Sequence, residues 1–156
     1  MNCQTVLSKA TKILKGQLIK NPKLDCEILL SNALKIEREK LLINLNQEIN
    51  KKDLNNFNNL IDRRKRKEPI AYIIGYKEFW KKKFKVNTNV LIPRPDTEHL
   101  VEEALKLIPN SSSLNILDIG TGSGCIILSI LCERSKCYGV ALDISKKALN
   151  VAKSNA

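Results

Sequence analysis

Glycines, hydroxyl groups and two carboxylates gather near the end of the chain. Residues 114–119 predict a buried strand that carries Asp118 and runs into a glycine turn. Such a turn lets a ligand approach the backbone closely, because no Cβ atoms stand in the way. An acid at the end of the next strand can accept two hydrogen bonds from a ribose diol. We therefore expect a nucleotide-like ligand to contact Asp143 and the turn formed by Gly120, Thr121, Gly122, Ser123 and Gly124.

The elements that would position these residues follow one another in a familiar order. Apolar residues from Ile126 to Leu131 predict a helix after the turn, and residues 138–142 predict a second strand that ends at Asp143. Ser145 is typical of a helix cap, and apolar residues continue after it. This order of strand, glycine turn, helix, strand and acid predicts the opening βαβ unit of a doubly wound, Rossmann-like α/β sheet.

The glycine spacing discriminates between two classes of ligand. The dinucleotide fingerprint G-x-G-x-x-G would need a glycine where Cys125 stands, and the pattern here is G-x-G-x-G. A negative Asp118 also disfavours a pyrophosphate and suits a cationic cofactor. The pattern resembles the first motif of methyltransferases that use S-adenosylmethionine. A dehydrogenase and a glycine turn that binds nothing remain as the alternatives.

The first part of the chain predicts a small bundle of short amphipathic helices. Four stripes of apolar residues recur at helical spacing and would form its core. They lie at residues 6–18, 24–34, 41–45 and 54–61. Residues 70–75 are mostly β-branched or aromatic and end in a glycine, and aromatic residues then alternate with lysines up to Val86, which predicts a hairpin that joins two domains. A further helix should begin near Asp96 or Thr97.

The charge of the chain favours acidic partners. The formal net charge is +11, and residues 63–67 are five consecutive basic residues. A positive field of this size attracts RNA, a ribosome surface or an acidic protein. Aromatic residues among the lysines up to residue 85 could stack on bases. The alternative is a solvated face with a few anchoring aromatic residues.

Cysteine usage and hydropathy point to a cytoplasmic protein. The five cysteines are odd in number and include no Cys-x-x-Cys pair, and His99 is the single histidine, so we expect no metal site. Most cysteines have apolar neighbours, which predicts buried free thiols in a reducing compartment. No stretch approaches the roughly 18 apolar residues of a membrane span.

Several strings together resemble the bacterial release factor glutamine methyltransferases. Residues 24–30 resemble the D-x-E-x-L-L signature of that family's helical domain, and residues 68–75 with 78–80 resemble its hairpin segment. Residues 91–98 (LIPRPDTE) resemble its most distinctive string, and residues 118–124 its cofactor loop. The resemblance implies transfer of a methyl group from S-adenosylmethionine to the glutamine amide of the Gly-Gly-Gln loop of peptide chain release factors.

The same resemblance implies roles for parts of the chain. Cofactor contacts would come from Asp118, residues 120–124 and Asp143, with Arg94 and Thr97 in a segment that covers the cofactor. The alternatives for these last two are an exposed turn charge and a helix cap. We expect a helical substrate-binding domain, a hairpin linker and the first part of the methyltransferase domain at residues 1–67, 68–90 and 91–156.

One motif of the family does not occur in this chain. The family's catalytic Asn-Pro-Pro-Tyr string, which orients the amide, matches none of the five prolines. We therefore expect a fragment or a truncated gene product that has no catalytic residue of its own, holds half of a cofactor pocket and does not catalyse transfer alone. Two strands would also leave a sheet edge open and one face poorly covered. The alternatives are an RNA methyltransferase that uses S-adenosylmethionine and a non-catalytic protein that binds a release factor or RNA.

Overall fold

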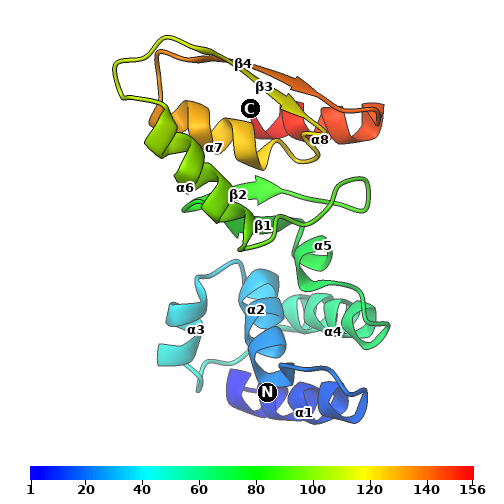
Figure 1. Ribbon diagram of the computed structural model, residues 1–156. Helices are drawn as coiled ribbons and strands as arrows, with labels where there is room; N and C mark the ends of the chain where they lie inside the picture. The colour runs from blue at the N-terminus through cyan, green and yellow to red at the C-terminus, as the bar shows by residue number, and fades with distance from the viewer. The chain divides into compact units, whose positions relative to one another are not determined.

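The computed structural model describes residues 1–156 and divides into two compact units (Figure 1). Unit 1 spans Met1–Ile74 and is built of helices, apart from one isolated bridge between Asn2 and Glu48. Unit 2 spans Gly75–Ala156 and combines three helices with two separate two-stranded sheets. The predicted class, a helical bundle followed by the start of a Rossmann-like α/β domain, is confirmed.

Unit 1 contains the four helices that the apolar stripes predict. Two of them begin at asparagine caps: Asn2 accepts a hydrogen bond from the Thr5 N–H, and Asn50 accepts one from the Asp53 N–H. α2 packs against both α1 and α4 and is the central helix of the unit. The helices are α1 (Cys3–Gly16), α2 (Pro22–Leu34), α3 (Arg38–Ile43), α4 (Lys51–Lys65) and the short α5 (Ile70–Ile74).

The core of unit 1 is fully closed by its own residues. Leu14 of α1, Leu29 and Leu30 of α2, and Phe57 of α4 are at most 1% exposed. Burying a large apolar side chain of this kind stabilises a fold by about 1.5–3 kcal/mol. The same apolar faces that produce the sequence stripes thus hold the helices together.

The strand expected at residues 70–75 is wrong, because residues Ile70–Ile74 form helix α5. The turn begins at Pro69, whose carbonyl accepts the N–H groups of Tyr72 and Ile73. It buries Ala71 and Ile73, and α5 contacts α2 and α4. Burial against these helices outweighs the β-propensity of the isoleucines. Gly75, with φ of 84°, ends the turn in the left-handed region.

Unit 2 begins with the predicted hairpin, which is confirmed for residues 76–85. β1 (Tyr76–Phe79) and β2 (Lys82–Lys85) pair antiparallel across a two-residue turn. Trp80 and Lys81 in this turn have φ of 48° and 60°, the left-handed values that a tight hairpin requires. Whether residues 68–90 act as a linker between two independent domains stays a prediction.

The βαβ unit follows the hairpin as predicted. α6 (Thr97–Leu107) leads to β3 (Asn115–Ile119), and α7 (Cys125–Glu133) connects β3 to the parallel strand β4 (Tyr138–Leu142). α8 (Lys146–Asn155) begins at Ser145, whose hydroxyl accepts the Ala148 N–H, so the predicted cap is confirmed. Helices α7 and α8 lie on one side of the β3–β4 sheet, between it and the hairpin (Figure 1).

The expectation of buried strands is wrong for one face of this sheet. Leu117, Ile119 and Val140 are 56%, 77% and 57% exposed, while Ile116 on the other face packs against the core of unit 2. The reason is the two-residue period of a strand: only the side chains that point toward α7 find partners. The poorly covered face that the sequence predicts is therefore present.

Cysteine burial follows the sequence analysis with one exception. Cys3, Cys26, Cys125 and Cys137 are buried free thiols, whereas Cys132 is free and exposed on α7. Burial raises the pKa of the Cys26 thiol to about 11. None of the helices is both long enough and apolar enough to cross a membrane.

Candidate cofactor site

The three loop glycines share a left-handed backbone but differ in their surroundings. Gly120, Gly122 and Gly124 have φ of 79°, 54° and 79°. A Cβ atom on Gly120 or Gly122 would meet nothing within 4 Å, so their backbone faces open space. A Cβ atom on Gly124 would lie 3.1 Å from Leu128 Cδ1 and 3.3 Å from Ala152 Cβ. The first two glycines leave room for a ligand, and the third allows α7 and α8 to pack closely.

The loop uses its own N–H groups to hold its shape. The N–H groups of Gly120 and Thr121 both donate to the Leu142 carbonyl, at 2.8 and 2.9 Å, and the Gly124 N–H donates to the Thr121 carbonyl at 2.8 Å. A pyrophosphate site relies on free N–H groups at this position. The loop is poorly supplied with them, which agrees with the interpretation of the glycine spacing.

Asp118, near the end of β3, is hydrogen-bonded to the glycine loop. Its Oδ2 accepts a hydrogen bond of 2.7 Å from the Thr121 hydroxyl, and Thr121 is buried. The structure therefore brings together the two residues at the strand end and in the turn. Ser123 is also buried, at 2% exposure, so the side chains of Thr121 and Ser123 face the protein, while the backbone of Gly120 and Gly122 faces open space.

Asp143 lies at the end of β4 and contacts the glycine loop. Its Oδ2 accepts the Gly122 N–H at 2.9 Å, and its Oδ1 accepts the Ser145 N–H at 2.9 Å. The hydrogen bonds from Ser145 and Gly122 lower the pKa of the Asp143 carboxyl, which is therefore ionised at neutral pH. A carboxylate has about four acceptor positions, so each oxygen keeps one for a hydroxyl donor.

Arg94 and Thr97 do not join this cluster through any hydrogen bond. Arg94 is exposed, and its carbonyl accepts the Thr97 N–H at 3.0 Å, which forms the turn before α6. Asp96 occupies the cap position of α6, but its side chain makes no capping hydrogen bond. The role of Arg94 and Thr97 as cofactor contacts stays a prediction.

One residue that the sequence analysis did not select reaches the loop. Asn155, at the end of α8, donates a hydrogen bond of 2.9 Å from its Nδ2 to the Ser123 carbonyl. No local pattern in the sequence marks this asparagine, because its partners lie in segments far from it along the chain. Only the packing of α8 on the loop reveals the contact.

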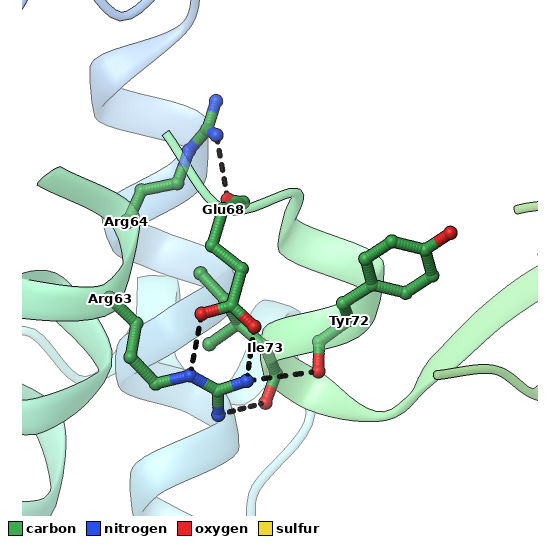
Figure 2. A network of polar contacts seen from close by, with 5 residues as sticks. All are labelled: Arg63, Arg64, Glu68, Tyr72 and Ile73. Carbon is green, nitrogen blue, oxygen red and sulfur yellow. Dashed lines mark hydrogen bonds and ion pairs between the residues drawn. The ribbon is translucent and has the colours of Figure 1, made fainter. Parts of the chain in front are cut away.

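The basic run of residues 63–67 is partly committed to unit 1. Figure 2 shows Arg63 held by Glu68 through two hydrogen bonds and donating to the carbonyls of Tyr72 and Ile73, each at 3.3 Å. Arg64 donates to the Glu68 carbonyl at 2.8 Å. The hydrogen bond from Arg63 lowers the pKa of the Glu68 carboxyl. Arg63 thus fastens α5 to α4, Arg64 holds the segment between these two helices, and only residues 65–67 of the run are exposed.

The acids of the D-x-E-x-L-L string are also structural in unit 1. Asp25 and Glu27 are 7% and 4% exposed and lie on α2. Asp25 pairs with Arg64 of α4 at 2.7 Å, and Glu27 pairs with Arg38 of α3 at 2.7 Å. Each acid therefore ties α2 to a neighbouring helix.

A surface cleft of about 550 Å³ lies beside the Glu27–Arg38 pair at the start of α2. Residues Lys20 to Leu24 complete its lining, and two lysines give it a basic rim. None of the residues predicted to bind the cofactor lines this cleft.

Comparisons with known proteins agree with the motifs. The PrmC N-terminal domain family matches residues 5–75. The release factor glutamine methyltransferase of Caulobacter vibrioides is 40% identical over 143 residues, which cover 92% of this chain and 50% of that protein. The enzyme of the same name from Coxiella burnetii is 43% identical over 153 residues, which cover 96% of this chain and 55% of that protein.

A second kind of relative matches a smaller share of its own length. The bifunctional methyltransferase of Rickettsia prowazekii is 41% identical over an alignment of 169 positions, gaps included, that covers 97% of this chain and 33% of that protein. The chain spans about half the length of the release factor glutamine methyltransferases it matches.

Proposed function

Because residues 5–75 match the family of PrmC N-terminal domains, we propose that this chain binds a release factor and S-adenosylmethionine. It would do so as the amino-terminal part of a release factor glutamine methyltransferase. The reaction would be methyl transfer to the side-chain amide of the glutamine in the Gly-Gly-Gln loop. The Asn-Pro-Pro-Tyr string does not occur among these 156 residues, so the chain would contribute binding and orientation rather than the amide-orienting motif.

One observation carries the cofactor part of the proposal: an ionised Asp143 lies beside loop glycines whose backbone faces open space. S-adenosylmethionine would supply a methyl group bound to a positively charged sulfur. Asp143 would accept the ribose hydroxyls at the positions that its two backbone hydrogen bonds leave free. Gly120 and Gly122 would let the cofactor pass close to the main chain.

The charge of the loop supports the same choice of cofactor. Asp118 and Asp143 both lie at carboxyl ends of parallel strands, where ligands bind in doubly wound sheets. Two carboxylates next to a loop with few free N–H donors would repel a pyrophosphate. A cationic cofactor is favoured at the same place.

The helical unit would supply the release factor contact. Among its exposed basic residues, Lys65, Arg66 and Lys67 are consecutive, and such a cluster favours an acidic protein surface. RNA or ribosome contact by the wider basic stretch of residues 63–85 remains a weaker alternative. Arg63 and Arg64 are held by ion pairs inside unit 1, and the remaining positive charges of the stretch are lysines apart from Arg66.

Calorimetric titration of the 156-residue chain with S-adenosylmethionine tests the cofactor part. We expect saturable binding that weakens about tenfold in Asp143→Ala, because the variant loses the charged acceptor of the ribose hydroxyls. Asp62→Ala, an exposed acid on α4, is the matched control and should bind as the wild type. Heat of binding that is absent from a folded wild-type chain, or unchanged in Asp143→Ala, would contradict the proposed cofactor site.

A pull-down of a purified bacterial release factor by the same chain tests the partner separately. We expect retention of the release factor that falls when Lys65, Arg66 and Lys67 are all changed to Ser. Retention of RNA fragments in place of the release factor would support the RNA-binding alternative. If neither the release factor nor RNA is retained, the proposed partner is contradicted, and the conclusion on cofactor binding from calorimetry is unaffected.

A further inference from the structure

The side-chain amide of Asn155 lies between the β1–β2 hairpin and the glycine loop. Its Oδ1 accepts the Lys85 main-chain N–H at 2.8 Å, and its Nδ2 donates to the Lys85 carbonyl at 3.1 Å. The same Nδ2 donates to the Ser123 carbonyl at 2.9 Å. One side chain thus makes three of the four hydrogen bonds that an asparagine can form.

The bonds to Lys85 complete the free edge of the hairpin. Lys85 is opposite Tyr76 in the β1–β2 register, while its own N–H and carbonyl both bond to Asn155. The next residue, Val86, donates its N–H back to Gly75 at 2.9 Å. Asn155 therefore takes the place of a third strand at this position, and the last residue of β2 is fixed by α8.

The bond to Ser123 fixes the glycine loop from the same helix. Ser123 is buried, and its carbonyl lies between two glycines that have no side chains to restrain them. The start of α8 also bonds to the site, because the Ser145 N–H donates to Asp143. Ala152 of α8 lies against Gly124. One helix thus touches the acid, the loop and the hairpin.

We propose that Asn155 is a positioning residue that couples the β1–β2 hairpin to the glycine loop, so that order in one segment is transmitted to the other. The coupling stands on the three hydrogen bonds themselves. The identity of the ligand that would exploit it, S-adenosylmethionine, rests on the proposed function. A ligand held at the loop would then also order the hairpin, none of whose residues is a predicted cofactor contact.

Amide hydrogen exchange of the full chain tests this coupling, with Asn155→Asp as the main variant. Aspartate keeps the size of the side chain and an acceptor for Lys85, but it places an oxygen against the carbonyls of Lys85 and Ser123. The hydrogen bonds from Nδ2 to these two carbonyls are lost, and losing a hydrogen bond of ordinary strength makes local opening about tenfold more frequent. We therefore expect about tenfold faster exchange at both Lys85 and Gly124. Asn150→Asp, on an exposed position of the same helix, is the matched control.

One further variant and the addition of ligand separate coupling from general damage. Asn155→Gln retains the amide and should restore part of the lost protection, while the fluorescence of Trp80 checks that unit 2 is folded. Adding S-adenosylmethionine to the wild type should slow exchange at Lys85 as well as in the loop. The same addition to Asn155→Asp should slow exchange in the loop alone.

The outcomes distinguish this inference from the proposed function. Exchange in Asn155→Asp within twofold of that in Asn150→Asp at Lys85 and Gly124 would overturn the coupling, with or without ligand. Ligand protection of the wild-type loop that does not extend to Lys85 would also overturn it, and the cofactor site would stand. No ligand protection anywhere in the wild type would overturn the cofactor site, and the ligand-free comparison would still decide the coupling.

Discussion

The acidic residues of the two distinctive motifs, one in each unit, have opposite surroundings. In unit 1, Asp25 and Glu27 are buried and each pairs with an arginine from another helix. In unit 2, Asp143 accepts only backbone N–H groups and no arginine or lysine neutralises it. In unit 1 the charge of each acid is neutralised by an arginine of the same fold. In unit 2 a negative charge stays available for a partner that is not part of the chain.

The apolar surfaces differ in the same direction. The helices of unit 1 close around Leu29, Leu30 and Phe57, whereas the β3–β4 sheet of unit 2 exposes Leu117 and Ile119 on one face. A motif that is distinctive in sequence can therefore serve either purpose. The D-x-E-x-L-L string maintains a core, and Asp143 beside the glycine loop keeps acceptor positions free for a ligand.

The largest expected effect comes from breaking the Arg64–Asp25 pair. Arg64→Ala leaves a buried carboxylate without its partner and should lower the free energy of unfolding of unit 1 by about 3 kcal/mol. Urea unfolding followed by circular dichroism measures this change. Arg66→Ala, an exposed neighbour, should change stability by less than about 0.5 kcal/mol. Equal effects in the two variants would contradict a structural role for the acid.

The same glycine-to-alanine change should have opposite signs in the two units. A Cβ atom on Gly139 of β4 would lie 2.7 Å from the Cδ1 atoms of Ile127 and Leu131. The ends of these side chains can shift, so Gly139→Ala should destabilise unit 2 by about 1 kcal/mol, the lower end of the cost of overpacking. Gly16 at the end of α1 has open space around it, and Gly16→Ala should stabilise unit 1 by about 0.5 kcal/mol. Thermal unfolding of both variants measures the difference. Two changes of the same sign would contradict this account of the packing.

A smaller gain is expected at the hairpin turn of unit 2. Lys81 pays a steric cost at φ of 60°, and glycine avoids it. Glycine also makes the unfolded chain more flexible, which offsets part of this gain. The net effect of Lys81→Gly should be to stabilise unit 2 by about 0.5–1 kcal/mol. Lys82→Gly, one residue later in β2, should instead be destabilising. The midpoint of urea unfolding, followed through Trp80 fluorescence, gives the sign for each variant.

The smallest effect is the response of the glycine loop to acid. Because the pKa of Asp143 is lowered in the fold, its contribution to stability is complete above its ordinary value of 3.8. That contribution is lost as the pH falls below this value and through the lowered pKa. The amide resonances of Gly122 and Ser145 should therefore shift together under acid in the wild type. In Asp143→Asn this titration should be absent, and a shift that persists in the variant would assign it to another group.

Sequence patterns predicted those parts of the fold that depend on neighbours along the chain. The apolar stripes located α1 to α4, and the glycine turn located the βαβ unit, because both signals repeat over a few residues. Residues 70–75 were mistaken for a strand, since isoleucines favour strands until burial against α2 and α4 decides otherwise. The exposed face of the sheet could be expected only from the number of strands, not from the composition of either strand.

The residues of the candidate site also fall into two groups, those that the sequence order predicts and those that only the packing reveals. Gly122 and Asp143 were selected from the order of strand, loop, helix and acid, and the structure joins them by a hydrogen bond. Asn155 was missed because its partner Lys85 lies 70 residues earlier. The ion pairs of Arg63 and Arg64 cannot be predicted, since a sequence does not show which members of a basic run pair with carboxylates. Contacts between distant segments are thus what sequence reasoning could not supply.

The division of the chain at Gly75 has a consequence for synthesis of the protein. Every ion pair and buried leucine of unit 1 lies before that glycine, so the unit needs no later residue to complete its core. At about 5–20 residues per second, translation of residues 75–156 takes roughly 4–16 seconds, which is long compared with the folding of a small helical domain. Unit 1 can therefore fold on the emerging chain before the exposed strands of unit 2 have been made.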